Sequence, residues 1–181
     1  MGSPATVSDS HCEADPSVAA TPTTRQGAPV GTLQEVFPMQ AFIIETANKP
    51  GEFARQTAAI ATRDINVAAI ALGLGSLGGS AFLAGDESGT RNALDTAGLK
   101  YHEVPVLTVW LDDKPGTAAK TAKKLADAGV NIELFAPVQY ADGKATIAIG
   151  VDKVDEARRV LTDQLIEWKV PQPMHAGSTT Y

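Results

Sequence analysis

The sequence predicts an α/β (α+β) fold made of two tandem ferredoxin-like βαββαβ units, each with an antiparallel sheet and helices on one face. A Lys-Pro-Gly motif at residues 49–51 recurs at 114–116, and an Asn flanked by β-branched residues at 65–67 recurs at 130–132. Both pairs are 65 residues apart, which is too long for most solenoid repeats and suits a duplicated small domain. Each copy also shows the same order of strand, turn, helix, strand, strand and helix.

Two segments without an apolar period flank the repeat. Residues 1–39 are rich in Ser, Thr, Ala, Pro and Gly and are predicted to be a disordered tail, because they cannot bury enough surface to offset their ordering entropy. Residues 171–181 are predicted to be a flexible tail, with fraying from Val170 onward. The first unit then covers 40–104 and the second 105–170, and so short a join should hold the two units in a fixed relation.

The first unit begins with a predicted strand at 40–47, in which Phe42 and Ile44 share one face. The turn residues 48–51 lead into a predicted helix at 52–63, whose apolar side is formed by Phe53, Thr57, Ile60 and Ala61. The remaining elements are strands at 66–74, 79–84 and 99–103, and a helix at 87–97 that Asp86 caps and Gly98 ends.

The second unit repeats this order from a predicted strand at 106–111. Asp112 or Asp113 can cap a helix at 117–128, whose apolar side is formed by Ala118, Ala122, Leu125 and Ala126. Strands at 132–140 and 144–151 are joined through residues 141–143, a strong Asp-Gly hairpin signal. Asp152 and Asp155 have the spacing of a capping-box variant before a helix at 154–168, after which little chain remains for a last strand.

Composition narrows the classes of function. The formal net charge of -6 is unfavourable for a nucleic-acid or anionic-membrane partner, because binding phosphates needs a basic surface. The chain lacks both the run of about 18 apolar residues that a membrane helix needs and a secretory signal, so the cytoplasm is expected by elimination. The single cysteine, Cys12, can form neither an internal disulfide nor a thiolate metal cluster, and no cofactor or metal is expected.

The two Pro-Gly turns are the candidate binding sites. Each joins a strand to the N-terminus of a helix, whose unpaired N–H groups and partial positive charge suit a carboxylate. Gly51 and Gly116 would let a ligand approach the backbone closely, while Asn48 and Asp113 could accept a hydrogen bond from an ammonium group. Together these features describe a receptor for a small zwitterion. The alternative is that each Pro-Gly only makes a tight turn and that Asp113 only caps a helix.

This pattern resembles the ACT domain family of small regulatory modules. The resemblance is carried by residues 112–116 with 129–132 and by residues 48–51 with 64–67, and it covers about residues 40–168. It implies binding of amino acids or similar metabolites where two units lie side by side. There, the loop after the first strand of one unit faces the start of the second strand of the other.

The resemblance nominates two sites. One consists of Asn48, Gly51, Glu52 and Phe53 with Asn131 and Ile132, and its mate of Asp113, Gly116 and Thr117 with Asn66 and Val67. Because Asn48 stands where the second copy has Asp113, the two sites need not be equivalent. Many relatives carry an attached enzyme domain, which this sequence does not show.

The other motifs in the sequence give weaker evidence of function. The glycines of residues 73–78 match G-x-G-x-x-G by letter, but a strand and not a helix is expected after them, which argues against dinucleotide binding. His102 beside Glu103 could orient a base, and His11 with Cys12 could bind a metal or react as a thiol, yet neither pair has further partners in the sequence. Trp110 and Trp168 are predicted to be packing residues.

We therefore expect a regulatory protein without catalytic activity. A ligand between the units would change their packing or oligomeric state, and a partner protein would read the change. Open sheet faces and edges make a homodimer the expected assembly. Two alternatives remain, a ligand-independent dimerisation module and a small ferredoxin-like enzyme, and for the enzyme no clustered acid–base pair is found in the sequence.

Overall fold

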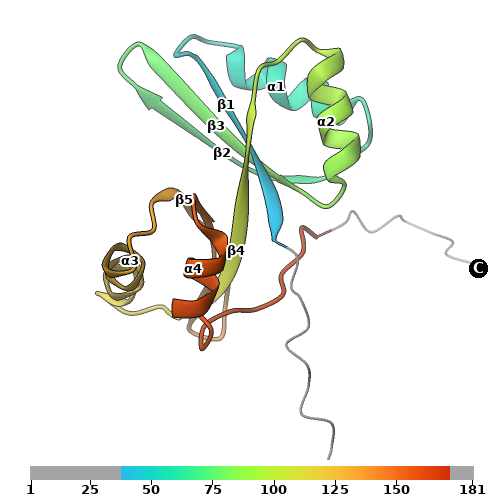
Figure 1. The fold of residues 1–181 in the computed structure, drawn as a ribbon. Helices are drawn as coiled ribbons and strands as arrows, with labels where there is room; N and C mark the ends of the chain where they lie inside the picture. The colour runs from blue at the N-terminus through green and yellow to red at the C-terminus, as the bar shows by residue number, and fades with distance from the viewer. Residues whose placement is uncertain (1–37, 172–181) are drawn as a thin grey trace, which may run out of the picture. The chain divides into compact units, whose positions relative to one another are not determined.

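The computed structural model describes residues 38–171 as six strands and four helices (Figure 1). The strands are β1 (Met39–Ala47), β2 (Val67–Leu74), β3 (Leu77–Ala84), β4 (His102–Asp112), β5 (Ile132–Ala141) and β6 (Lys144–Val151). The helices are α1 (Glu52–Ala61), α2 (Glu87–Thr96), α3 (Thr117–Asp127) and α4 (Val154–Val160). Nearly all of the predicted N-terminal tail lies outside the described residues, as do His11, Cys12 and residues 172–181. Met39, which was placed in that tail, belongs to β1.

All six strands form a single antiparallel sheet in the order β2-β3-β1-β4-β6-β5. The order β2-β3-β1-β4 is that of one ferredoxin-like unit, and β4-β6-β5 begins a second. The predicted fold class is therefore confirmed. The prediction of separate strands at 99–103 and 106–111 is wrong, because β4 runs unbroken through both and is shared by the two units.

Pro105 lies inside this shared strand, where a residue without an N–H group is normally disfavoured. β4 pairs with β1 over residues 102–106 and with β6 over residues 106–112, so Pro105 stands where the ladder changes sides. Its partner across β1 is Gln40, whose N–H donates instead to Glu87 Oε1 at 2.8 Å. The missing donor of Pro105 is therefore tolerated at the join between the units.

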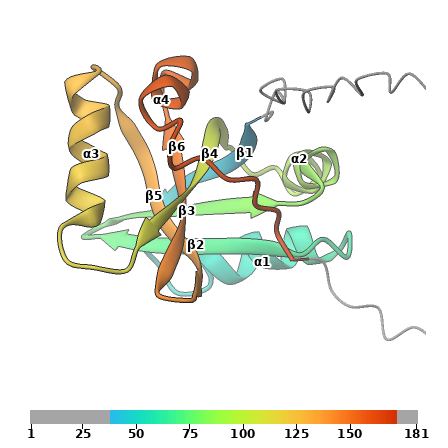
Figure 2. The same cartoon turned by 90° about the horizontal axis from the view of Figure 1, so that it is seen from below.

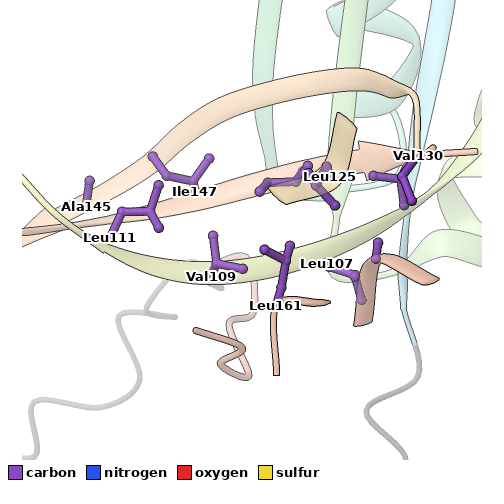
Figure 3. Packing of buried hydrophobic residues seen from close by; sticks show 11 residues of the cluster. Leu107, Val109, Leu111, Leu125, Val130, Ala145, Ile147 and Leu161 are labelled. Carbon is purple, nitrogen blue, oxygen red and sulfur yellow. The ribbon is translucent and has the colours of Figure 1, made fainter. Parts of the chain in front are cut away.

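Each unit has its own apolar core beneath its helices. In the first, Phe42 and Phe82 of the sheet pack with Ile60 of α1 and Leu94 of α2. In the second, side chains of β4 and β6 pack with α3 and α4 (Figure 3). The labelled members of this cluster are Leu107, Val109, Leu111, Leu125, Val130, Ala145, Ile147 and Leu161. The strand members of this cluster are every second residue of β4 and of β6, because successive side chains point to opposite faces of the sheet.

The alternation in β4 places all four helices on one face of the sheet. Glu103 is opposite Phe42 in the pairing with β1 and faces α2, while Leu107 and Val109, an even number of residues further on, face α3 and α4. The opposite face has no helix within the described residues. Its centre carries a third apolar cluster, in which Val170 packs against Ala41 and neighbouring strand residues.

Val170 belongs to a segment, residues 164–171, that we call the C-terminal strap. The helix predicted at 154–168 ends at Val160, and the strap then pairs antiparallel with β4 through Leu165 opposite Val109. This is the place of the fourth strand that the second unit otherwise lacks. The strap then crosses the helix-free face toward β2 (Figure 2). The predicted fraying from Val170 is wrong, because this side chain is 3% exposed.

The predicted apolar sides of α1 and α3 are correct at Ile60 and Leu125, but in each helix a polar residue that the prediction did not include is also buried. In α1 the buried residues are Gln56 and Ile60, and Phe53 and Ala61 are exposed. In α3 they are Thr121 and Leu125, and Ala118 and Ala126 are exposed. Because the strands and the corner set the rotation of each helix, a polar residue was turned inward at the same place in both copies.

Two predicted caps are also corrected. The N-cap of α3 is Gly116 and not Asp112 or Asp113, and Asp152 accepts a hydrogen bond from the N–H of Asn131 at 2.8 Å instead of capping α4. Asp86 does cap α2, by accepting from the N–H of Gly89. Among the helices of residues 38–171, none has the length and apolar character needed to cross a membrane.

Candidate small-molecule site

The two Pro-Gly turns form matching corners between a strand and a helix. We call residues 48–51, between β1 and α1, the first corner, and residues 113–116, between β4 and α3, the second corner. Gly51 and Gly116 have φ angles of 91° and 88°, in the left-handed region that glycine adopts without strain. The N–H of Asn48 donates to the Ser76 carbonyl at 3.0 Å, and the N–H of Asp113 donates to the Gly143 carbonyl at 2.9 Å. The backbone of the duplicated motif is thus repeated in structure.

The two corners lie at opposite ends of the sheet. Ile43 is paired with His102 at the start of β4, so the first corner lies beyond that end, whereas the second corner follows the other end of β4. Val67 and Ile132 open their strands near the middle, opposite Ala84 and Val151. Measured along the strands, the first residue of β2 lies roughly 20 Å or more from the second corner, and the first residue of β5 lies equally far from the first corner. Within one chain the structure therefore does not bring together either predicted set of site residues.

The two asparagines nominated for these sites make contacts within the chain. Asn66 Nδ2 donates to the carbonyl of Pro171, which ties the strap to the start of β2. Asn131 uses its N–H to bind Asp152, and its side chain is exposed. Val67 and Ile132 pack at the edges of the two cores. Their part in ligand binding stays a prediction, and it requires a second chain.

A pocket of about 160 Å³ lies at the first corner. Its walls are the end of β1, the first turns of α1 and the adjoining ends of β2 and β3. The lining residues are Thr46, Ala47, Asn48, Lys49, Glu52, Phe53, Gln56, Ala71, Leu72, Gly73, Gly78, Gly79 and Ser80. Three of the four residues predicted for this side of the site, Asn48, Glu52 and Phe53, therefore line one hollow.

Asn48 closes the pocket against the β2–β3 hairpin. Its Nδ2 donates to the Gly75 carbonyl at 2.9 Å, and a Cβ on Gly73 would lie only 2.9 Å from that Nδ2 atom. The hairpin turns directly from β2 into β3, so the glycines of residues 73–78 lead into a strand, as predicted. They shape the pocket wall and do not form a dinucleotide fingerprint.

Glu52 places a negative charge in the pocket wall. Its carboxylate accepts hydrogen bonds from Arg55 Nη2 at 2.9 Å and from Thr46 Oγ1 at 3.1 Å. These bonds, the one from Arg55 first, lower the pKa of Glu52 below its ordinary value. The carboxylate is therefore ionised at neutral pH and can pair with a ligand ammonium group. The adjacent start of α1 presents N–H groups without an intrahelical acceptor, which suit a carboxylate.

Gln56 is the pocket residue that the sequence did not reveal. Its side chain is 0% exposed, and its Oε1 accepts a hydrogen bond from the Ser80 hydroxyl. Its Nε2 has no hydrogen-bond partner among the described residues. An unpaired buried amide donor is uncommon, because it has lost its water without gaining an acceptor. A Gln among the alanines of a helix gives no signal of this in the sequence.

The second corner lacks these polar groups. The residues 65 positions after Thr46, Gln56 and Ser80 are Leu111, Thr121 and Ala145. Leu111 and Ala145 belong to the apolar core, and Thr121 Oγ1 donates to the Thr117 carbonyl of its own helix at 3.2 Å. Asp113, Gly116 and Thr117 lie together at the start of α3, and the hydroxyl of the buried Thr121 one turn further on is already bonded within the helix. The two corners thus share a backbone and differ in chemistry.

The remaining functional candidates from the sequence form hydrogen bonds or ion pairs within the chain. Glu103 binds Arg91 through both carboxylate oxygens and so does not serve His102 as a base partner. Trp110 is 51% exposed, which differs from the predicted packing role, and borders an open hollow of about 540 Å³ with Trp168. Both indole N–H groups are paired, with Thr146 and Gln139. Within residues 38–171, no His, Cys, Asp and Glu side chains gather into a group that could hold a metal ion.

Comparison with protein-family models gives no match, and comparison with curated proteins gives none either. Among solved structures, protein BT0572 from Bacteroides thetaiotaomicron is similar with a TM-score of 0.60 and 22% identity, over 72% of this chain and 92% of that chain. The regulatory subunit of aspartate kinase from Thermus flavus has a TM-score of 0.51 and 22% identity, over 70% of this chain and 92% of that chain.

The ligand-free form of the corresponding subunit from Thermus thermophilus has a TM-score of 0.50 and 22% identity, over 71% of this chain and 93% of that chain. At this identity the likeness concerns the fold. The fold is of the ACT type that the sequence resembles.

Proposed function

We propose that this chain is a non-catalytic regulatory protein of the cytoplasm that binds an amino acid or a similar small metabolite at its first corner. The observation that carries the proposal is the pocket beside the N-terminus of α1, which combines an ionised Glu52 with helix N–H groups. These groups complement the two charges of a zwitterion. The ACT-type fold, shared with two aspartate kinase regulatory subunits, supports a regulatory role.

The proposed site is completed by a second copy of the chain. The first corner and the start of β5 are at different levels of one sheet, so Asn131 and Ile132 can reach a first corner only from another molecule. A two-fold homodimer would form two such contacts by symmetry, each between the first corner of one chain and the start of β5 of the other. The outer strands β2 and β5 are sheet edges within the described residues, and such edges favour pairing between chains. A ligand bound at these contacts between the two chains would change the packing of the dimer, and a partner protein would respond to that change.

The first test is thermal unfolding of the full chain in the presence of each common amino acid. A ligand that binds only the folded protein stabilises it by RT ln(1 + [L]/Kd), about 2.7 kcal/mol at 100 Kd. A rise in melting temperature with one or a few amino acids supports the proposal. A stable dimer that is indifferent to every amino acid and related metabolite would favour the alternative of a ligand-independent dimerisation module.

The second test asks whether two chains build the site. Gly51→Ala alters the first corner, and Asn131→Ala removes an exposed side chain whose backbone N–H keeps its bond to Asp152. Neither variant alone should bind the ligand. Mixing and re-associating the two should restore about a quarter of the wild-type capacity, because half the dimers are mixed and each has one intact contact. Normal binding by Asn131→Ala would place the whole site within one chain.

A further inference from the structure

We propose that the pocket at the first corner selects amino acids whose side chain is uncharged and carries an oxygen acceptor, and that the buried amide of Gln56 makes this selection. The inference rests on the proposed function above and names the class of ligand for the same site. It goes beyond the corner motif, because Gln56 is not part of the Pro-Gly turn or of the residues nominated by resemblance.

The first step concerns the orientation of the Gln56 amide. Ser80 on β3 donates its hydroxyl hydrogen to Gln56 Oε1, which leaves Nε2 as the free end of the amide. Gln56 lines the inner end of the pocket, and its 0% exposure means that no water-sized group touches Nε2 in the ligand-free structure, so a ligand side chain must part the wall around Gln56 to pair with it. A ligand held by its α-ammonium and α-carboxylate at the rim would direct its side chain inward. The group that satisfies Nε2 is then an oxygen acceptor on that side chain.

The second step excludes a charged side chain. Glu52 lies one helical turn before Gln56 and lines the same pocket with an ionised carboxylate. A side-chain carboxylate carried to the buried Nε2 would exchange its hydration for a single neutral donor, which costs far more free energy than burying an amide or hydroxyl oxygen. A cationic side chain offers only donors, and Nε2 is itself a donor. An uncharged side chain with an oxygen atom fits both groups.

The third step concerns the space available. The wall contributed by β2 and β3 consists of Ala71, Leu72, Gly73, Gly78, Gly79 and Ser80, and four of these six, Ala71 and the three glycines, carry at most a methyl group. The cavity of about 160 Å³ therefore exists because these positions carry little or no side chain. In the second unit, Val138 stands at the position equivalent to Gly73, Leu111 at that of Thr46 and Thr121 at that of Gln56. The selection is thus a property of the first unit alone.

The experiment is isothermal titration of the full chain with near-isosteric pairs of amino acids, asparagine against leucine and glutamine against methionine, and with aspartate as the charged comparison. Wild type should bind at least one amide at least tenfold more tightly than its hydrocarbon match, because a site built to hydrogen-bond a polar group discriminates strongly. Aspartate should bind more weakly than asparagine. Gln56→Met keeps the length of the side chain and removes the donor, and it should bring the ratio within each pair close to one.

The matched control is Thr121→Ala, which alters the equivalent position of the second unit and should leave the ratios unchanged. If no amino acid binds wild type, the proposed function fails. If amino acids bind but leucine or methionine equals its amide partner, or Gln56→Met keeps the wild-type ratio, the function stands and this inference is overturned. If Gln56→Met does not fold, a crystal structure of wild type with bound asparagine tests whether Gln56 contacts the ligand. The side-chain oxygen should lie within hydrogen-bond distance of Gln56 Nε2, and any other placement overturns the inference.

Discussion

Arg91 and Glu103 form a two-pronged ion pair in which Nε and Nη2 of the guanidinium donate to the two carboxylate oxygens at 2.8 and 2.7 Å. The pair fastens α2 to the start of β4, the strand that both units share. The hydrogen bonds from Arg91 lower the pKa of Glu103 below its ordinary value, because they favour the ionised carboxylate. Bidentate geometry is the strong form of such pairs, although exposure of the two side chains at 40% and 30% lets solvent screen it.

Glu103→Gln should therefore lower the free energy of unfolding modestly, by up to about 1 kcal/mol at neutral pH. Because the folded pKa of Glu103 is depressed, its contribution is present above the ordinary value of 4.5 and is lost as pH falls through the folded pKa. Urea unfolding at pH 7 and at lower pH values measures the difference between the variant and wild type. The difference should shrink in acid, and Glu133→Gln, on an exposed position of β5, should show neither effect. A gap that stays constant with pH would contradict the ion-pair explanation.

Val170→Ala tests whether the C-terminal strap stabilises the sheet. The side chain is 3% exposed and packs with Ala41, Leu83 and Val106 where the two units join. Removing two buried methyl groups should lower the free energy of unfolding by about 1–3 kcal/mol. Lys169→Ala, next to it in the strap, removes an exposed side chain and its solvent-exposed ion pair with Glu167, and should change stability by less than about 0.5 kcal/mol. Equal stability of the two variants would mean that the strap does not cover this face.

Local signals in the sequence predicted much of this fold. The duplicated Lys-Pro-Gly motif gave both corners, and Asp142-Gly143 gave the β5–β6 hairpin, whose two turn residues have φ angles of 52° and 70°. Asp86 was predicted as the α2 cap and acts as one. Each of these features depends on a few adjacent residues, so a sequence read on its own contains the information.

Features that depend on distant partners were missed. Leu161 and Leu165 have helical spacing, but Leu165 pairs with β4, a contact that no local pattern encodes. The strand shared by the two units depends on pairing with β1 up to Val106 and with β6 from Val106 onward. The predicted apolar side of the first helix does not include Gln56, because burial of this polar side chain depends on Ser80, which is 24 residues away. For the candidate site, sequence therefore located the corner and not its inner wall.

The corner glycines allow a test in which each copy serves as the control for the other. A Cβ at Gly51 or Gly116 would meet no atom within 4 Å, so the cost of an alanine comes only from its positive φ. Gly51→Ala and Gly116→Ala should each lower the free energy of unfolding by about 1–2 kcal/mol. Gly79→Ala adds a Cβ in equally open space without a positive φ and should be close to neutral. Unequal losses at the two corners in chemical denaturation would contradict their equivalence as backbone structures.

Alanine substitutions at the two corners should have different effects on ligand affinity although their effects on stability are equal. The added methyl group of Gly51→Ala lies in the open space beside the α1 N-terminus, where the carboxylate of a zwitterion is expected to sit, so affinity should fall at least tenfold. Gly116→Ala makes the same change above Leu111 and Ala145, which offer no polar wall, and affinity should stay within about twofold of wild type. Titration calorimetry with the amino acid that raises the melting temperature most measures both. Loss of binding in Gly116→Ala with normal binding in Gly51→Ala would move the site to the second corner, because the two variants carry equal backbone strain and differ only in the groups around the glycine.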